Sequence, residues 1–236
     1  MILDVRKAFC ACGMALLGLA TIGADDSAPA PGPSWPGSFV GRVEALALIE
    51  TLNADLLSHD SATVTLEHWC DVHRLASPSR IVAVRVPNVD KPPTPEQRRE
   101  LGVTPTELVR YRRVRLLCGA VLLSEADNWY VPGRLAPEMN QLLSTTDIPF
   151  GKVVQPLHFQ RHTLSSRLLW HPLPEGWEMS PASAGDPAAR LSLPPNVLEH
   201  KAVLTLPDGT PISEVVETYT DGVLAFPAPP PGRSAP

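Results

Sequence analysis

The order of two hydrophobic patterns limits what this chain can fold into more than any other feature of its sequence. Apolar residues at spacings of three and four come first, and short β-branched runs bounded by turn residues follow. The first pattern is typical of amphipathic helices, and the second of antiparallel strands. Helices followed by strand pairs predict an α+β fold, in which a single antiparallel sheet carries helices on one face.

Two helices are expected near the start of this pattern. The first lies between Gly41 and Ser58, where one helical face carries Val43, Leu46, Ile49, Leu52 and Leu56. Asp60 and Ser61 follow, and side chains of these types cap helix N-termini. A second helix should therefore begin there and end near Pro78.

Strand-type segments fill most of the remaining chain. They are residues 81–86, 109–117, 122–131, 158–170, 197–206 and 211–220. Asp208–Gly209 separates the last two and favours a hairpin turn, because these residue types adopt positive φ. Between the strands we expect proline-rich loops at 87–95 and 172–195, one helical turn at 104–107, a short helix at 137–143 and a turn at 147–151.

The two ends of the chain differ from its middle. Arg6 and Lys7 precede a short apolar run, Ala8–Ala20, and small residues follow it, which is typical of the leader of an exported protein. The run is too short for a comfortable membrane-spanning helix. We therefore divide the chain into a leader (1–24), a Pro/Ala-rich linker (25–40), a folded domain (41–226) and a Pro-rich tail (227–236).

Composition and motifs exclude several classes of function. The net charge is −5, so there is no basic excess for a nucleic-acid surface. The sequence has no glycine-rich phosphate loop, no nucleophile elbow and no H-E-x-x-H metal motif. His158 and His162 are four residues apart, but no carboxylate-bearing metal motif accompanies them. We therefore expect no nucleic-acid partner, no metal and no cofactor.

The chain has four cysteines, of which Cys10 and Cys12 lie in the leader. Cys70 and Cys118 could pair in an exported protein, but a sequence does not say whether two cysteines are close in space. Two small buried thiols are the interpretation that we favour.

Arginine and glutamate are the remaining candidates for chemistry. Arg113 and Arg115 share one face of the strand at 109–117, and Arg110 and Arg112 share the other, because alternate residues of a strand point the same way. Glu214 and Glu217 lie on opposite faces of the last strand. One interior arginine and one interior glutamate would suit a small ligand that carries a carboxylate and a hydroxyl group.

Four segments, in this order, resemble the chorismate pyruvate-lyase (4-hydroxybenzoate synthase) family. Leu56–Thr63 resembles its L-L-x-x-D-S-x-T segment, and Arg113–Pro132 resembles its hairpin. Ile148–Lys152 resembles its P-L-G-R/K turn, and Gly209–Glu217 resembles its final G-x-P…E strand. Together the segments span about residues 42 to 226.

The resemblance implies an antiparallel sheet with helices on one side and a buried site under two helical flaps. The family removes pyruvate from chorismate and leaves 4-hydroxybenzoate, without a metal or an organic cofactor. Carried over, Arg113 would bind the ring carboxylate and Glu217 would contact the ring hydroxyl. The backbone at Phe150 and Gly151 and the amide of Ala62 would complete the pocket.

The sequence departs from the family pattern at the flap hairpin and leaves two assignments open. Asp127–Asn128 stands where the family has a Gly-Arg pair whose arginine serves the enolpyruvyl carboxylate, and Arg134 lies nearby. The match to Glu217 needs one inserted residue, so Glu214 stays an alternative. Arg112 precedes Val114, Leu116 and Cys118, an apolar stripe, so Arg112 stays an alternative to Arg113.

These observations predict a lyase that converts chorismate into a hydroxybenzoate. The alternative is an exported, non-catalytic binder of a small aromatic or cyclic carboxylate. In either case the partner is a small molecule, the protein is a monomer, and no membrane contact is expected after the leader is removed. The leader places the protein in the periplasm or outside the cell, with the cytoplasm as the alternative.

We predict that residues 1 to about 24 are removed on export, because this apolar segment ends well before the first amphipathic face. N-terminal sequencing of protein from fractionated cells should then begin near Asp25 in the periplasmic or secreted fraction. An intact Met1 in the soluble cytoplasmic fraction would contradict export and favour the cytoplasmic alternative.

Overall fold

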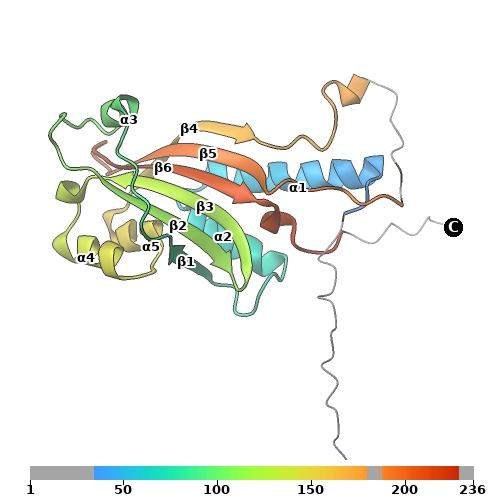
Figure 1. Cartoon of the computed structure of the whole chain (residues 1–236), viewed down its shortest axis with the longest axis horizontal. Coiled ribbons are helices and arrows are strands. Elements are labelled where there is room, and N and C mark those ends of the chain that lie inside the picture. The colour runs from blue at the N-terminus through green and yellow to red at the C-terminus, as the bar shows by residue number, and fades with distance from the viewer. Residues whose placement is uncertain (1–34, 180–185, 187, 229–236) are drawn as a thin grey trace, which may run out of the picture. The chain divides into compact units, whose positions relative to one another are not determined.

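The computed structural model describes residues 35–179, 186 and 188–228, which are coloured in Figure 1. The predicted leader, most of the linker and most of the tail lie outside these residues. Within the described ranges, no helix combines the length and the hydropathy needed to cross a bilayer.

Six antiparallel strands form one sheet with the order β1-β2-β3-β6-β5-β4 (Figure 1). The strands are β1 (Ile81–Arg85), β2 (Arg110–Cys118), β3 (Val121–Tyr130), β4 (Gln160–Leu168), β5 (Asn196–Thr205) and β6 (Pro211–Thr220). Two hairpins, β2–β3 and β5–β6, meet at the centre, where β3 pairs with β6. The predicted α+β class with a single antiparallel sheet is confirmed.

The two long helices cover one face of this sheet. They are α1 (Phe39–Ser58) and α2 (Ala62–Val72), and both lie behind the sheet in Figure 1. Ser61 caps α2 as predicted, since its side chain accepts a hydrogen bond from the Val64 amide. Ile49, Leu52 and Leu56 of the predicted helical face are fully buried. Two shorter helices, α4 (Pro137–Thr145) and α5 (Phe150–Val154), follow β3.

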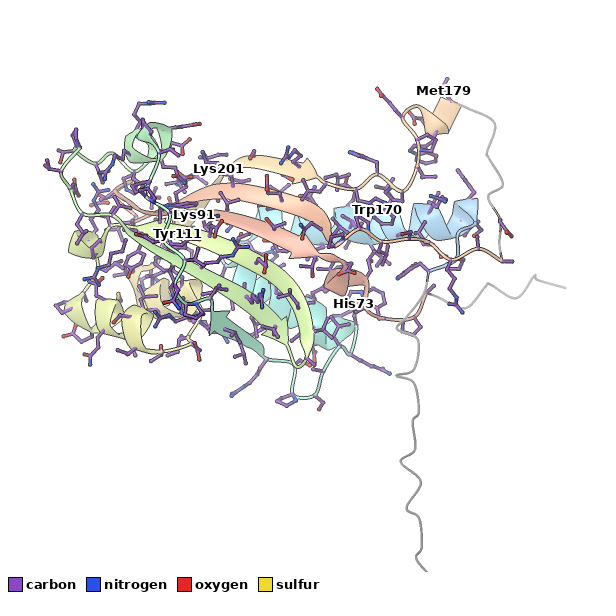
Figure 2. All side chains as sticks on the ribbon, viewed as in Figure 1. His73, Lys91, Tyr111, Trp170, Met179 and Lys201 are labelled. Atoms are coloured by element: carbon purple, nitrogen blue, oxygen red, sulfur yellow. A yellow bond between two sulfur atoms is a disulfide. The ribbon has the colours of Figure 1, made fainter. Side chains whose placement is uncertain are left out.

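The segment between β1 and β2 crosses the opposite face of the sheet and carries the short helix α3 (Pro95–Glu100). Lys91, labelled in Figure 2, forms an ion pair of 2.5 Å with Asp127 of β3. The indole of Trp129 donates to the Lys91 carbonyl at 2.8 Å. The long helices are therefore on one face, as predicted, while this segment shields part of the other.

Two local predictions between the strands differ from the structure. Residues 104–107 form a non-helical turn, and the helix lies earlier, at α3. Thr94 and Gln97 cap each other's backbone amides at its start, and Pro95 already has the φ of a first helical residue, so this segment nucleates more readily. The turn predicted at 147–151 also ends early, because Phe150 begins α5.

The core begins before the predicted domain boundary at residue 41. Trp35, within the predicted linker, is fully buried, and its indole donates to the Leu224 carbonyl at 3.0 Å. Its ring also packs edge-on against Phe226, with centroids 5.7 Å apart. The two ends of the described domain therefore pack against each other.

Cys70 and Cys118 form a disulfide between α2 and the end of β2, with their Cα atoms 6.2 Å apart. The interpretation as two free thiols is therefore wrong. Cys118 follows Val114 and Leu116 on the buried face of β2, and this face lies against α2, which brings the two sulfur atoms together.

Replacing Cys70 and Cys118 by serine should lower the free energy of unfolding by roughly 2–4 kcal/mol, because the bond closes a loop 48 residues long in the unfolded chain. Urea unfolding with and without reductant measures this loss. Reductant should destabilise the parent protein and leave the double variant unchanged. Alkylation of both cysteines without reductant, seen by mass spectrometry, would contradict the bond.

Candidate functional site

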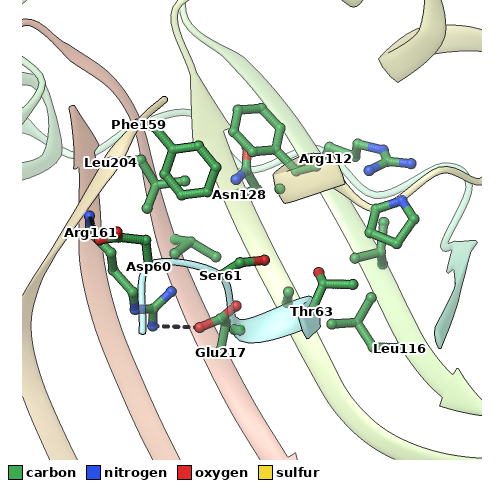
Figure 3. Close-up of a pocket in the computed structure, with 17 residues that line it drawn as sticks. Asp60, Ser61, Thr63, Arg112, Leu116, Asn128, Phe159, Arg161, Leu204 and Glu217 are labelled. Atoms are coloured by element: carbon green, nitrogen blue, oxygen red, sulfur yellow. Dashed lines mark hydrogen bonds and ion pairs between the residues drawn. The ribbon is translucent and has the colours of Figure 1, made fainter. Parts of the chain in front are cut away.

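A cavity of about 50 Å³ lies between the sheet and the helices that cover it (Figure 3). Its roof consists of two short segments, Asp60–Thr63 at the start of α2 and Pro149–Gly151 at the start of α5. Phe159 closes one side. The sheet contributes Arg112, Val114, Leu116, Ala126, Asn128, Arg161, Leu204, Val215 and Glu217.

The cavity is narrower than a ring-shaped ligand requires. A volume of about 50 Å³ holds a few water molecules, whereas a cavity that takes benzene measures roughly 150 Å³. The two roof segments approach each other closely, since a Cβ atom at Gly151 would lie 3.4 Å from the Ser61 hydroxyl. A cyclic ligand therefore has to move these segments outward.

Arg112 stands at one end of the cavity with incomplete hydrogen bonding. Arg112 is buried, with an exposed fraction of only 6%. Its Nη2 donates to the carbonyls of Thr146 and Ile148 at 3.2 and 3.0 Å, while Nε and Nη1 have no partner. An unsatisfied buried donor costs about 1–3 kcal/mol, and more when it is charged. Burial and the nearby charge of Arg85 lower the pKa of Arg112 to about 10, so it remains a cation at neutral pH.

At the other end of the cavity, Arg161 and Glu217 form an ion pair of 2.6 Å (Figure 3, dashed line). The exposed fractions of their side chains are only 4% and 8%. Tyr219 also donates to Glu217 at 3.1 Å. Both bonds use Oε2 of Glu217, which leaves Oε1 free of these two partners. Asp60 supports the pair by accepting from the Arg161 amide at 2.9 Å.

Two further polar side chains lie one at each end of the cavity, since Asn128 is the partner of Arg112 in the β2–β3 register and His200 is the partner of Glu217 in the β5–β6 register. Asn128 donates through Nδ2 to Ser213 at 2.8 Å, while its Oδ1 has no partner. His200 lies opposite Glu217 in the β5–β6 register, and burial lowers the pKa of His200 to about 4. The imidazole is therefore neutral at physiological pH. Polar groups thus stand at both ends of an otherwise apolar cavity.

Four of the five site residues expected from the sequence line this cavity: Ala62, Phe150, Gly151 and Glu217. Arg113 does not. It lies on the opposite face of β2 and pairs with Glu125 at 2.8 Å and with Asp127 at 3.7 Å. Arg112 occupies the cavity instead, because it shares the buried face with Val114 and Leu116. Arg112, the alternative that the sequence left open, is therefore the one of the two arginines that lines the cavity.

Arg161 is the main cavity residue that sequence reasoning missed. The sequence predicts a strand at 158–170, but no local pattern marks Arg161 as a site residue. Its burial depends on Glu217 from β6 and on Asp60 from the loop between α1 and α2. Arg134, considered as a substitute for the family's flap arginine, lies elsewhere and donates to the carbonyls of Leu101 and Pro211.

Glu214, the alternative to Glu217, lies on the opposite face of the sheet under α3. It is fully buried and accepts from the Gln97 amide at 3.0 Å, while the Lys201 ammonium is 3.5 Å away. Burial and the neighbouring Glu100 carboxylate raise the pKa of Glu214 to about 7. Glu214 therefore holds α3 against the sheet and does not reach the cavity.

The raised pKa of Glu214 predicts a pH dependence of stability. The folded protein holds this proton more tightly than the unfolded chain does, where the pKa is 4.5. The contribution of Glu214 to the free energy of unfolding therefore falls as pH rises from about 4.5 towards 7. Urea unfolding should show that the free energy of unfolding of the parent protein, relative to that of Glu214→Gln, falls by on the order of 1 kcal/mol over this pH range. Glu138→Gln, at an exposed carboxylate of α4, should show no such slope, and a parent protein that gains stability over this range would contradict the assignment.

In the part of the chain that the structure describes, no group of three or more His, Cys, Asp or Glu side chains is placed to hold a metal ion.

Comparison with known proteins finds a close relative in sequence. The uncharacterized protein y4mC of Sinorhizobium fredii is 58% identical over 199 residues, which cover 83% of each chain. The chain belongs to the y4mC family. No family model matches the sequence.

Among solved structures, the likeness is partial. PhnF from Mycobacterium smegmatis has a TM-score of 0.44 at 12% identity, covering 75% of this chain and 71% of that one. The effector domain of the same protein has a TM-score of 0.43 at 13% sequence identity, covering 68% of this chain and 88% of that one. A GntR-family transcriptional regulator from Enterococcus faecalis has a TM-score of 0.39 at 11% sequence identity, covering 63% of this chain and 99% of that one. Neither a ligand nor an activity of this chain follows from likenesses at this level.

Proposed function

We propose that the cavity binds a small cyclic or aromatic carboxylate. The observation that carries this proposal is the buried, charged Arg112, which has two nitrogen atoms without hydrogen-bond partners. A planar carboxylate satisfies guanidinium N–H groups with short, charge-assisted bonds. The ligand's charge would also compensate the charge that the fold buries.

The remaining walls suit the body of such a ligand. Val114, Leu116, Phe150, Phe159 and Val215 offer apolar surface to a ring. At the end opposite Arg112, Oε1 of Glu217 is an acceptor for a ring hydroxyl, whereas Oδ1 of Asn128 lies near Arg112, its partner in the β2–β3 register. A hydroxybenzoate or a related cyclic hydroxy acid therefore matches the order of groups along the cavity.

Turnover of chorismate is the second candidate, favoured by the position of Glu217 at the end of the cavity opposite Arg112. In this reaction C4 of chorismate loses its proton and the bond from C3 to the ether oxygen breaks. The freed electron pair completes the aromatic ring, and the departing enolpyruvate takes up a proton at carbon and becomes pyruvate. Glu217 would orient the C4 hydroxyl. Asn128 stands where the chorismate pyruvate-lyase family has arginine. We therefore assign the unpartnered Nε of Arg161 to the enolpyruvyl carboxylate.

We also propose that the protein acts outside the cytoplasm. The predicted leader supports export, and a disulfide such as Cys70–Cys118 persists in oxidising compartments. Export separates the protein from the cytoplasm, where chorismate is made. Location therefore favours ligand binding over chorismate turnover, and we propose a monomer that binds its ligand without a membrane partner.

Calorimetry with 4-hydroxybenzoate and 3-hydroxybenzoate tests the site. We expect Arg112→Gln to weaken binding about 10- to 100-fold, because it removes charge-assisted hydrogen bonds. Arg115→Gln is the matched control, because Arg115 lies on the opposite face of β2 and does not line the cavity, and it should change affinity less than twofold. The proposal fails if neither compound binds, or if Arg115→Gln has the larger effect. Thermal unfolding of each variant checks that the fold is retained.

The same preparation, incubated with chorismate and followed by chromatography, separates the two candidates. Formation of hydroxybenzoate and pyruvate above the uncatalysed background, lost in Glu217→Gln, would establish a lyase. Tight binding of hydroxybenzoates without turnover of chorismate would support a binding protein and exclude the lyase.

A further inference from the structure

A second cavity, of about 220 Å³, opens where β1 ends and β2 begins. Four arginine residues line it, Arg85, Arg110, Arg112 and Arg113, and we call it the arginine cleft. We propose that the arginine cleft is an oxyanion-binding site that takes a phosphate, sulfate or carboxylate group. The proposal does not depend on the ring-shaped ligand proposed above.

The cleft exists because β2 is longer than its neighbour. Arg85, the last residue of β1, pairs with Val114, so residues 110–113 of β2 extend beyond β1. The Val86 amide donates to the Arg113 carbonyl at 3.0 Å, and the chain then leaves the strand edge. The space beside this edge is the cleft. Its walls come from the sheet, from the loop that follows β1, and from Leu143 and Ser144 of α4.

The positive charge of the cleft exceeds the negative charge that compensates it. Glu125 and Asp127 pair with Arg113. Arg85 donates to the Ser144 carbonyl, a neutral partner. The side chain of Arg110 is exposed and forms no hydrogen bond or ion pair within the described part of the chain. Like charges gathered in a concave, partly water-excluded space focus a field that attracts anions.

Arg112 distinguishes this cleft from an ordinary solvated basic surface. Arg112 is only 6% exposed, so water does not satisfy its Nε and Nη1 atoms, which have no hydrogen-bond partner. Asp147 favours the charged form of Arg112 but forms no ion pair with it. In a planar guanidinium the Nε–H and Nη1–H bonds lie on different edges. One side chain can therefore donate on both sides, and Arg112 lines both cavities.

A tetrahedral oxyanion fits the charge and the shape of this space. Phosphate, sulfate and carboxylate share oxygen atoms that accept several N–H donors at once, and arginine is suited to such acceptors. Arg85 and Arg110 are exposed and stand at the mouth, where they would draw the anion in, while the buried Arg112 would receive it.

The test uses the full mature chain and inorganic phosphate, sulfate and acetate, titrated by calorimetry at constant ionic strength held with potassium chloride. Arg112 stays unchanged, because it also lines the first cavity. The variants are Arg85→Gln and Arg110→Gln at the mouth of the cleft. Arg80→Gln is the matched control, since this exposed arginine precedes the other end of β1 and makes the same change in net charge.

We expect saturable binding of at least one oxyanion to the parent protein, weakened about three- to tenfold in Arg110→Gln and in Arg85→Gln. Arg80→Gln should stay within twofold of the parent, and the Nε–H resonance of Arg112 should shift on addition of the anion. The proposal is overturned if no oxyanion binds saturably, or if Arg80→Gln weakens binding as much as the cleft variants do. Phosphate binding without any hydroxybenzoate binding would leave the cleft standing and refute only the proposed function.

Discussion

The guanidinium of Arg112 is buried and needs hydrogen-bond acceptors and a compensating negative charge, which the surrounding structure supplies only in part. Two main-chain carbonyls satisfy Nη2 of Arg112, and its pKa of about 10 keeps it charged at neutral pH. The residues that the structure describes supply no ion-pair partner for this charge. A ligand anion would compensate this charge, whether it enters from the cavity under α2 and α5 or from the arginine cleft.

The fold handles its other buried charges differently. Arg161 is paired with Glu217 and lies close to Asp60, so that end of the cavity carries no excess positive charge, while the Arg112 end is positive. On the far face, Glu214 is buried beside Lys201 and Glu100, and its raised pKa reflects first its burial and then the neighbouring Glu100 carboxylate. The charge difference between the two ends of the cavity would orient a ligand that carries one acid group and one hydroxyl.

The disulfide and the roof lie at opposite ends of α2. Cys70 fixes the helix to β2, whereas Ala62 and Thr63 cover the cavity eight residues earlier, about 12 Å away along the helix. Opening of the roof is therefore compatible with an intact disulfide, because the motion can be confined to the first turn of α2, the preceding loop and the start of α5. Ligand entry would then leave the core near Cys118 undisturbed.

Sequence alone determined the order and type of the main elements, because the periodicities of α1, α2 and the six strands are local properties of the chain. It also placed Glu217, Phe150 and Gly151 near one another through the resemblance, and it showed that Arg112 and Arg113 must face opposite ways. Only the tertiary structure decided which of the two is buried, because that depends on the face of β2 that the helices cover. The pairing of Cys70 with Cys118 and of Arg161 with Glu217 was likewise decided by packing, since each joins residues 48 or more positions apart that no local pattern connects.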